Sequence, residues 1–169
     1  MSPRDPLANP EPLIRRVYAY VAYRVGDGPD AEDITSATFE RALRGRDTYD
    51  PKRGTPLAWI LGIARHCISD MARTRDTPVA GILDVPQPGD FEEDSVGRLT
   101  LAAALAQLDP HDQDLIALRY GADLTARRIG EILGMTANAT EVALHRALAR
   151  LRAILSEPEG SATPGPHDR

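Results

Sequence analysis

Hydrophobic residues recur at the three- and four-residue spacing of α-helices in two blocks of the chain. In the first block, the pattern predicts a helix that ends near Gly26, a second from Pro29 to about Gly45 and a third from about Pro56 to Arg75. The side chains expected on their apolar faces are Leu13, Val17, Tyr20, Val21, Ile34, Phe39, Leu43, Trp59, Ile60, Ile63, Ala64, Cys67 and Met71. No stretch alternates polar and apolar residues for long enough to predict a strand, so the predicted fold class is all-α.

The second block begins near Ser95 and carries four predicted helices. A break at Asp109 separates the first helix from the second, and Thr125 opens a short third helix that Gly134 stops. Thr136 can cap the last helix through its hydroxyl group. The apolar stripe of that helix consists of Leu144, Leu148, Leu151 and Leu155.

These patterns predict two small helical domains that are joined by an extended linker. We expect a three-to-four-helix bundle over residues 10–75 and a four-helix domain with a helix-turn-helix over residues 95–155. The linker, residues 76–94, is rich in proline, glycine and acidic residues and has no regular period. The tail, residues 156–169, has the composition of a disordered segment.

The net charge of −5 is unevenly distributed along the chain. Residues 1–75 carry 12 basic and 10 acidic side chains, residues 76–95 carry none and 6, and residues 96–156 carry 7 and 6. Neither helical block is basic enough to bind DNA tightly by charge alone. The single cysteine, Cys67, rules out an internal disulfide framework and a cysteine-only zinc site. No transmembrane span or secretory signal is visible, so we expect a cytoplasmic protein without membrane insertion.

The segment from Leu124 to Arg150 has the pattern of a helix-turn-helix. A short helix and a longer one flank the turn at Gly134, and Gly130 provides a small residue where two crossed helices would approach closely. From periodicity alone, a simple helical hairpin and a DNA-binding unit explain the pattern equally well.

Several short motifs occur in a characteristic order. In the first block these are Asp30-Ala31-Glu32-Asp33, Thr38-Phe39-Glu40-Arg41-Ala42, Tyr49-Asp50-Pro51-Lys52-Arg53-Gly54, Ala58-Trp59-Ile60 and Ile63-Ala64-Arg65. In the second block they are Leu108-Asp109-Pro110, Leu118-Arg119-Tyr120, Ile129-Gly130-Glu131-Ile132-Leu133-Gly134 and the run from Leu144 to Arg152. Over residues 10–155, their order and spacing resemble the extracytoplasmic-function (ECF, group IV) bacterial sigma factors of the sigma-70 family.

The resemblance implies a function in transcription initiation. Such a protein binds core RNA polymerase, recognises the −10 element through region 2 and the −35 element through region 4, and melts DNA near the start site. It is not an enzyme and needs no cofactor or metal, because the polymerase performs the chemistry. The implied partners are core RNA polymerase, promoter DNA and an anti-sigma factor.

Within region 2, the resemblance implies a polymerase contact at the start of the second predicted helix. The residues concerned are Asp30, Glu32, Asp33 and Arg41. Carboxylates at this point can accept hydrogen bonds from arginines of the polymerase, but they also suit the positive end of a helix dipole.

The following loop and the third predicted helix resemble the −10 recognition site of the family. The candidate DNA contacts are Arg46, Tyr49, Asp50, Lys52, Arg53, Arg65, His66 and Arg73. A base flipped out of the stack needs a planar or polar pocket with phosphate anchors nearby. Tyr49 can stack on such a base or serve as a buried anchor for the loop, and His66 stands where the family usually has asparagine.

The last predicted helix resembles the −35 recognition helix, with two departures. Glu141 and Ala143 stand where relatives commonly carry lysine and arginine, whereas arginines replace alanine and glutamate on the preceding helix. The candidate −35 contacts are Arg127, Arg128, Thr136, Asn138, Glu141, His145 and Arg146. We expect the arginines to hold phosphates and Glu141 to accept a hydrogen bond from a cytosine amino group.

Two other kinds of function fit parts of the pattern. A two-domain helix-turn-helix regulator would bind duplex DNA as a dimer on a palindromic site. An interaction module would have kept the helix-turn-helix without binding DNA. Nothing in the sequence indicates an enzyme, since a nucleophile elbow, a phosphate-binding loop and a pair of catalytic acids are all absent.

Overall fold

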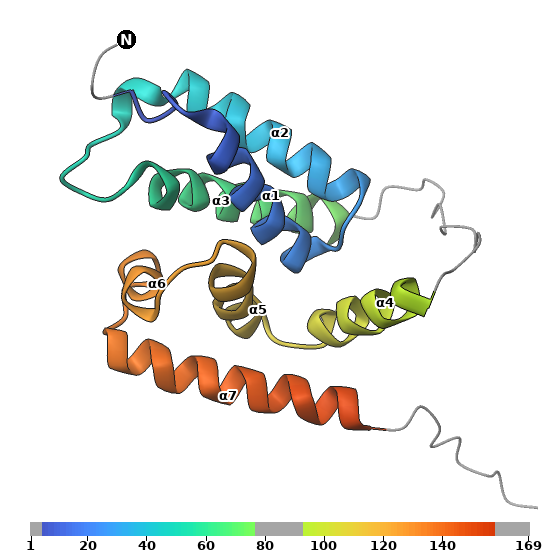
Figure 1. The fold of residues 1–169 in the computed structure, drawn as a ribbon. Coiled ribbons are helices and arrows are strands. Elements are labelled where there is room, and N and C mark those ends of the chain that lie inside the picture. The colour runs from blue at the N-terminus through green and yellow to red at the C-terminus, as the bar shows by residue number, and fades with distance from the viewer. Residues whose placement is uncertain (1–4, 77–92, 158–169) are drawn as a thin grey trace, which may run out of the picture.

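The computed structural model describes residues 5–76 and 93–157, and these residues are helical with no strand among them (Figure 1). The first half consists of α1 (Pro10–Val25), α2 (Pro29–Arg44), the short 3-10 helix η1 (Arg46–Thr48) and α3 (Pro56–Asp76). The second half consists of α4 (Glu93–Ala106), α5 (Pro110–Ile116), the π-helical turn η2 (Ala117–Gly121), α6 (Ala126–Leu133) and α7 (Ala137–Ser156). The all-α prediction is confirmed, whereas the predicted linker, residues 76–94, and tail, residues 156–169, lie largely outside the described residues.

Capping side chains define the helices of the second half. The side chains of Asp109, Thr125 and Thr136 each accept a hydrogen bond from a backbone N–H in the first turn of the helix that follows. Gly134 ends α6 in the left-handed conformation, at φ +71°. These local sequence features explain why the predicted boundaries in this half agree with the structure.

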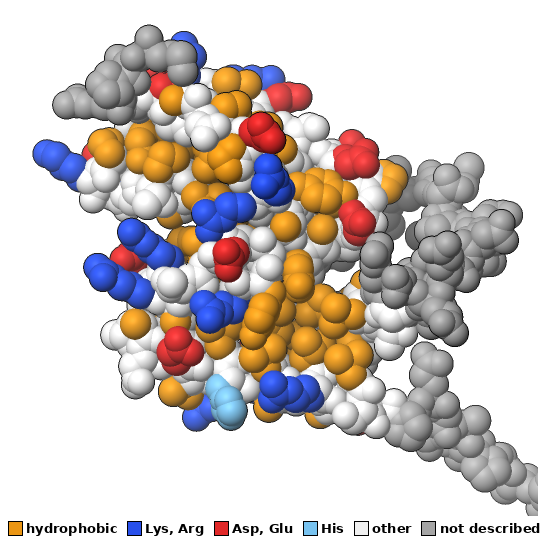
Figure 2. Space-filling view, in the orientation of Figure 1, with side chains coloured by type: hydrophobic (Ala, Val, Ile, Leu, Met, Phe, Trp, Pro, Cys, Tyr) orange, Lys and Arg blue, Asp and Glu red, His pale blue; other side chains and the backbone are white. Residues whose placement is uncertain are grey.

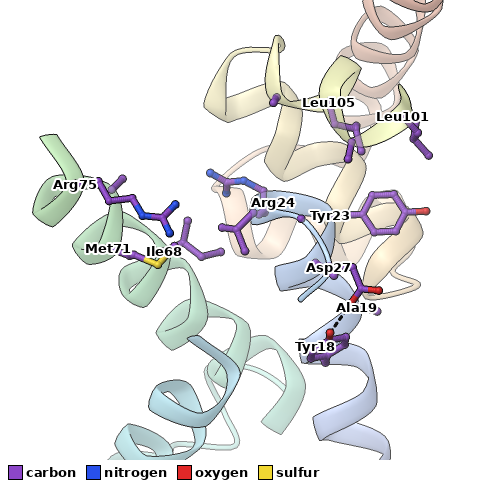
Figure 3. A pocket seen from close by; sticks show the side chains of 16 residues that line it. Tyr18, Ala19, Tyr23, Arg24, Asp27, Ile68, Met71, Arg75, Leu101 and Leu105 are labelled. Carbon is purple, nitrogen blue, oxygen red and sulfur yellow. Dashed lines mark hydrogen bonds between the residues drawn. The ribbon is translucent and has the colours of Figure 1, made fainter. Parts of the chain in front are cut away.

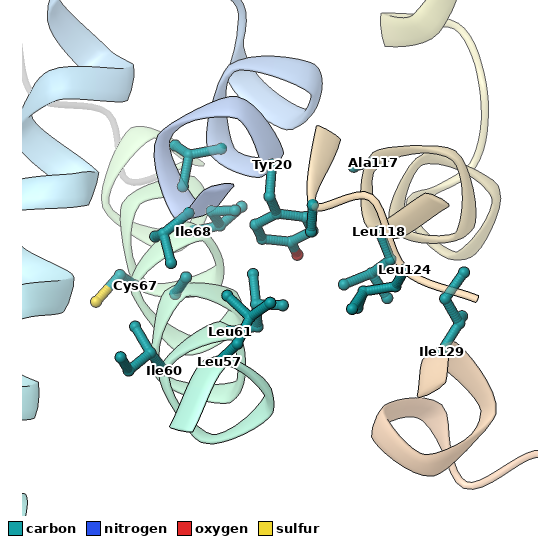
Figure 4. Close-up of a cluster of buried hydrophobic side chains, with 14 of the residues drawn as sticks. Tyr20, Leu57, Ile60, Leu61, Cys67, Ile68, Ala117, Leu118, Leu124 and Ile129 are labelled. Atoms are coloured by element: carbon teal, nitrogen blue, oxygen red, sulfur yellow. The ribbon is translucent and has the colours of Figure 1, made fainter. Parts of the chain in front are cut away.

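The two halves share one hydrophobic core rather than forming separate ones. Tyr20 of α1 is fully buried between side chains of α3, such as Leu61, and side chains of the second half, such as Leu118 and Ile129 (Figure 4). A smaller cluster around Ile116, Ala147 and the end of α4 lies within the second half. The predicted two-part division of the chain is therefore not a division of its core.

A buried carboxylate crosses the boundary between the halves. Asp114 of α5 accepts hydrogen bonds from the Tyr20 hydroxyl group at 2.6 Å and from Arg65 Nε at 2.9 Å, and it also pairs with the guanidinium group of Arg24. Only 8% of the Asp114 side chain and 11% of the Arg24 side chain are exposed. We call these four residues the Asp114 cluster. Burial and the adjacent carboxylate raise the pKa of Tyr20 above its usual value.

Close backbone contact accompanies this cluster. A Cβ atom at Gly121 would lie 2.8 Å from the Ala19 carbonyl oxygen and 2.8 Å from Tyr20 Cα, so η2 approaches α1 more closely than any other residue type would allow. Next to it, Arg16 donates hydrogen bonds to the carbonyl oxygens of Ala122 and Asp123, at 2.8 and 3.0 Å.

The boundary is incompletely filled at one end. A cavity of about 820 Å³ lies between the C-terminal ends of α1 and α3 and the helix α4. Arg24 from α1, Ile68 and Met71 from α3, and Leu101 and Leu105 from α4 line it (Figure 3). The Asp114 cluster therefore borders a largely apolar hollow through Arg24.

Two predicted core positions are wrong. Leu43 is 56% exposed and Leu155 is 44% exposed, although each lies at helical spacing from buried residues. Both residues lie near the C-terminal end of a helix, and no other helix of the part of the chain that the structure describes buries them. Periodicity identifies the apolar face of a helix, but it does not show how much of that face is packed against other helices.

Candidate nucleic-acid interface

The helix-turn-helix consists of α6, the turn at Gly134 and α7. A Cβ atom at Gly130 would lie 2.5 Å from the Met135 carbonyl oxygen and 3.0 Å from Thr140 Oγ1, so this glycine permits the crossing of the two helices. Thr140 is itself fully buried and donates a hydrogen bond to the Thr136 carbonyl oxygen at 2.9 Å. The close crossing that the sequence predicts at Gly130 is confirmed.

One face of α7 is polar, exposed and without internal partners. Asn138, Glu141 and His145 lie at positions i, i+3 and i+7 of this face, and Arg146 lies beside them. Within the described residues, none of the four makes a side-chain hydrogen bond or ion pair. The opposite face buries Leu144, Ala147 and Leu151. The arrangement leaves a row of hydrogen-bonding side chains available to an external ligand.

The arginines of α6 lie near this face but are already paired. Arg128 Nη1 lies 2.9 Å from Glu131 Oε2, and Arg127 Nε lies 3.5 Å from Glu131 Oε1. The hydrogen bond from Arg128, together with the charge of Arg127, lowers the pKa of Glu131 below its usual 4.5. Basic side chains gather on the surface over α6 (Figure 2). Both guanidinium groups remain substantially exposed, so a phosphate can still reach them.

The loop before α3 is held by its own side chains. The ring of Tyr49 packs at a tilt against Trp59, with 5.5 Å between ring centroids, and its hydroxyl group donates to the Gly54 carbonyl oxygen at 3.0 Å. Asp50 accepts a hydrogen bond from the Lys52 backbone N–H at 3.0 Å. The side chains of Tyr49 and Asp50 therefore make contacts within the loop and with α3. Arg46, Lys52 and Arg53 are exposed.

A hollow of about 490 Å³ opens beside this loop, between α2 and α3. Trp59, Ile63 and His66 form part of its lining, and Arg41, Asp70 and Arg73 contribute charged groups. Arg41 Nη1 donates to Asp70 Oδ2 at 2.9 Å, and Arg73 pairs with the other oxygen of the same carboxylate. These two bonds lower the pKa of Asp70 below its usual 3.8. The structure thus brings Arg41 into the same hollow as His66 and Arg73.

The acidic residues at the start of α2 are divided between two environments. Asp30 pairs with Arg75 at the end of α3, at 2.5 Å. Glu32 and Asp33 are exposed and make no ion pair within the described part of the chain. Only the latter two present unengaged carboxylates to a partner protein.

Arg65 is separated from the other candidate contacts of α3, because its guanidinium group bonds to Asp114 of the second half. The sequence did not predict that Asp114, Asp70 and Glu131 each hold the guanidinium group of a candidate DNA contact. A signal for Asp114 was present: it shares a helical face with Leu118 and Gly121, at i+4 and i+7, and an acid on an apolar face needs a buried partner.

No helix among residues 5–76 and 93–157 combines the length and the apolar character that a membrane crossing requires. In the same two ranges, no group of three or more histidine, cysteine and carboxylate side chains is placed to hold a metal ion.

Comparisons with known proteins agree with this arrangement. The model of Sigma-70 region 2 matches residues 11–77, and that of Sigma-70, region 4 matches residues 104–153. ECF RNA polymerase sigma factor BldN of Streptomyces coelicolor is 30% identical over 149 residues, covering 83% of this chain and 56% of the relative, so the chain spans little more than half of that protein. RNA polymerase sigma factor CarQ of Myxococcus xanthus is 30% identical over 150 residues, covering 85% of each chain.

The fold also has a solved counterpart. The sigma factor RpoE of Bartonella quintana, in complex with the anti-sigma factor NepR, superposes with a TM-score of 0.63 at 19% identity, covering 85% of this chain and 91% of that chain. At this identity the likeness shows the fold alone. The two matched regions and the identity to CarQ over most of both chains lead to one conclusion: the chain belongs to the ECF family of sigma-70-type RNA polymerase sigma factors.

Proposed function

We propose that this protein directs transcription initiation by binding core RNA polymerase and recognising the −10 and −35 elements of promoters. Region 2 would comprise residues 10–75 and region 4 residues 95–155, with residues 76–94 as the linker and residues 156–169 as a tail. The protein would act in the cytoplasm, where the polymerase performs the chemistry. The observation that carries the proposal is the exposed, unpartnered polar face of α7 on a helix-turn-helix, in a chain that contains both sigma regions.

On region 4, α7 would enter the major groove of the −35 element. Asn138, Glu141 and His145 would contact base edges, because they form the exposed row on this helix. Thr136 would donate to a phosphate at the start of the helix, where the dipole favours an anion. The phosphate contacts on either side would come from Arg127, Arg128 and Arg146.

On region 2, the hollow between α2 and α3 would receive a base of the −10 element that has been flipped out of the duplex. Its aromatic wall and its histidine suit a planar ligand with polar edges. The phosphates on either side would be held by the exposed cations of the loop and of α3, namely Arg46, Lys52, Arg53 and Arg73, and by Arg65 once its guanidinium group is released from Asp114. Tyr49 and Asp50 would act indirectly, by fixing the shape of the loop.

The polymerase contact would be made by Glu32 and Asp33. Asp30, which pairs with Arg75, would hold this end of α2 against α3, and Arg41, which pairs with Asp70, would do so near the other end of α2. Unpaired carboxylates at the start of α2 are ready to accept hydrogen bonds from arginines of a partner. The solved complex of RpoE with NepR supports an anti-sigma factor as a further partner of this chain.

Transcription with purified components tests the proposal. The chain is added to bacterial core polymerase and a library of promoter fragments, and complex formation and RNA synthesis are measured. We expect a stable complex and initiation from a subset of fragments. Replacing Glu32 and Asp33 together by arginine should abolish complex formation, whereas Glu40→Gln, on the same helix, should leave it unchanged. Absence of both complex and transcript would refute the proposal, and dimeric binding to palindromic duplexes would support a regulator instead.

A further inference from the structure

The Asp114 cluster joins a residue of region 4 to three residues of region 2 that together suit an oxyanion. Arg24 and Arg65 present two guanidinium groups, and Tyr20 presents a hydroxyl group, to the two carboxylate oxygens of Asp114. Guanidinium groups bind carboxylate and phosphate oxygens with the same geometry. The site therefore has the chemistry of a phosphate site and holds a carboxylate of the same chain.

We propose that Tyr20, Arg24 and Arg65 form an oxyanion site of region 2 that Asp114 occupies while the two halves are packed together and that a DNA backbone phosphate occupies once they separate. Asp114 is then an internal competitor of promoter DNA. The inference rests on the proposed function, because it takes Arg65 as a contact to the −10 strand.

Promoter geometry requires the separation. The −10 and −35 elements are centred about 25 base pairs apart, which is about 85 Å of duplex at 3.4 Å per base pair. The longest helices have 20 and 21 residues, or about 30 Å, and the halves are in direct contact through Tyr20 and Leu118. Two such halves in contact cannot place their DNA-binding surfaces that far apart. The 16 residues between Asp76 and Glu93 can extend over roughly 55 Å, so the covalent connection permits it.

The packed arrangement contains features that favour reversible opening. Within the described residues, Arg24 Nε is the buried side-chain nitrogen without a hydrogen-bond partner, so the guanidinium group is incompletely satisfied. The cavity of about 820 Å³ beside Arg24 removes packing from the same end of the boundary. Core polymerase, by binding the separated halves better than the packed ones, would shift this equilibrium.

Two substitutions open the boundary by different means. Gly121→Ala places a Cβ atom against the backbone of Ala19 and Tyr20, which cannot move aside as a side chain could, and its three nearest contacts all belong to α1. Asp114→Asn keeps the size and one acceptor of the side chain but removes its charge. Gly62→Ala is the matched control, since a Cβ atom there meets nothing within 4 Å.

The first measurement is the radius of gyration of the full chain by small-angle X-ray scattering, with helix content checked by circular dichroism. We expect the wild type and the Gly62→Ala variant to be compact and the Gly121→Ala and Asp114→Asn variants to be expanded at unchanged helix content. An expanded wild type, or compact forms of both opening variants, would overturn the proposal.

The second measurement is the affinity for a fluorescent pool of random-sequence single-stranded DNA. The opening variants should bind about tenfold more tightly, because the apparent dissociation constant scales inversely with the binding-competent fraction. Adding Arg65→Ala to Gly121→Ala should remove this gain while the chain stays expanded. Expansion without any gain in affinity would mean that Asp114 does not compete with phosphate, which also overturns the proposal. Failure of transcription with core polymerase would instead count against the proposed function, since neither of these two readouts uses polymerase.

Discussion

The two candidate DNA-binding surfaces differ in whether their polar side chains are already paired within the protein. On α7, the side chains of Asn138, Glu141 and His145 are exposed and have no hydrogen-bond or ion-pair partner among residues 5–76 and 93–157. In the hollow between α2 and α3, a single carboxylate, Asp70, holds the guanidinium groups of both Arg41 and Arg73. The polar side chains of α7 are available to a ligand, whereas the charge of the two arginines in the hollow is already half compensated by Asp70.

This difference separates two routes to binding. A ligand of α7 needs to displace only water, so its affinity should respond directly to each substitution on the exposed face. A phosphate that approaches the hollow must compete with Asp70 for the same guanidinium groups, and substitutions there change the competition as well as the contact. The arginines of α6, which share Glu131, are intermediate between the two.

The largest predicted effect comes from the crossing of α6 and α7, which holds the exposed face of α7 in place. Gly130→Ala forces a Cβ atom against the Met135 carbonyl oxygen and should lower the free energy of unfolding by about 2 kcal/mol, with loss of duplex binding. Gly62→Ala, in an uncrowded helical position, should instead raise it by up to about 1 kcal/mol. Urea unfolding of both variants provides the measurement, and equal stabilities would show that α6 and α7 do not cross as closely as described.

The next largest effect concerns the charge of the exposed face of α7. Glu141→Lys should tighten binding to duplex DNA roughly tenfold at low salt and make its salt dependence steeper. A preference for cytosine worth about 1 kcal/mol or more should disappear from the bound sequences. Selection from a randomised duplex library measures both. Unchanged affinity and unchanged base preference would place Glu141 outside the groove.

A smaller effect is expected in the hollow between α2 and α3, where Asp70 pairs with two arginines. Asp70→Asn releases Arg41 and Arg73 and should increase the affinity for single-stranded DNA severalfold. The two arginines lower the pKa of Asp70 below 3.8, so its ion pairs persist above that value and are lost only as the pH falls through the lowered pKa. The ratio of mutant to wild-type affinity should therefore be constant between pH 6 and pH 8. A ratio that varies over this range would mean that another titrating group controls the hollow.

The smallest predicted effect concerns the arginines of α6, which are paired with Glu131 but remain exposed. Arg128→Ala should weaken duplex binding about twofold at all sequences and reduce the salt-dependence slope by about 0.9, the value for one lost phosphate contact. Glu131→Gln, which frees both arginines of α6, should act in the opposite direction. Parallel titrations at several salt concentrations distinguish the two, and an unaltered slope in Arg128→Ala would exclude a phosphate contact at this residue.

The structure also indicates which features sequence reasoning can and cannot supply. The caps at Thr125 and Thr136, the turn at Gly134 and the close crossing at Gly130 are local, and each was predictable because the residue type and its spacing determine the geometry. The pairing of Arg65 with Asp114 joins residues 49 positions apart across the two halves, and no periodicity within one helix indicates it.

The shared core was unpredictable for a related reason. Two blocks of helices separated by a proline-rich segment usually indicate two independent cores. Tyr20 is apolar enough to fit the stripe of its own helix, but the sequence does not show that the second half covers its other side. Leu43 shows the opposite error. It lies on the apolar face of its helix, but the residues that pack against this face do not extend as far as Leu43, so it is exposed.

The burial of Tyr20 between the halves has a consequence for how such a chain can evolve. In the proposed function, promoter recognition is modular, since each region would contact its own element, and exchange of one region between relatives would be a simple way to change specificity. A chimera, however, would inherit half of a core and half of a charge cluster, and a mismatch at Tyr20, Gly121 or Asp114 would alter the balance between the packed and separated forms. The two regions would therefore be constrained to diverge together at these positions, even where the promoter elements that they recognise are free to change independently.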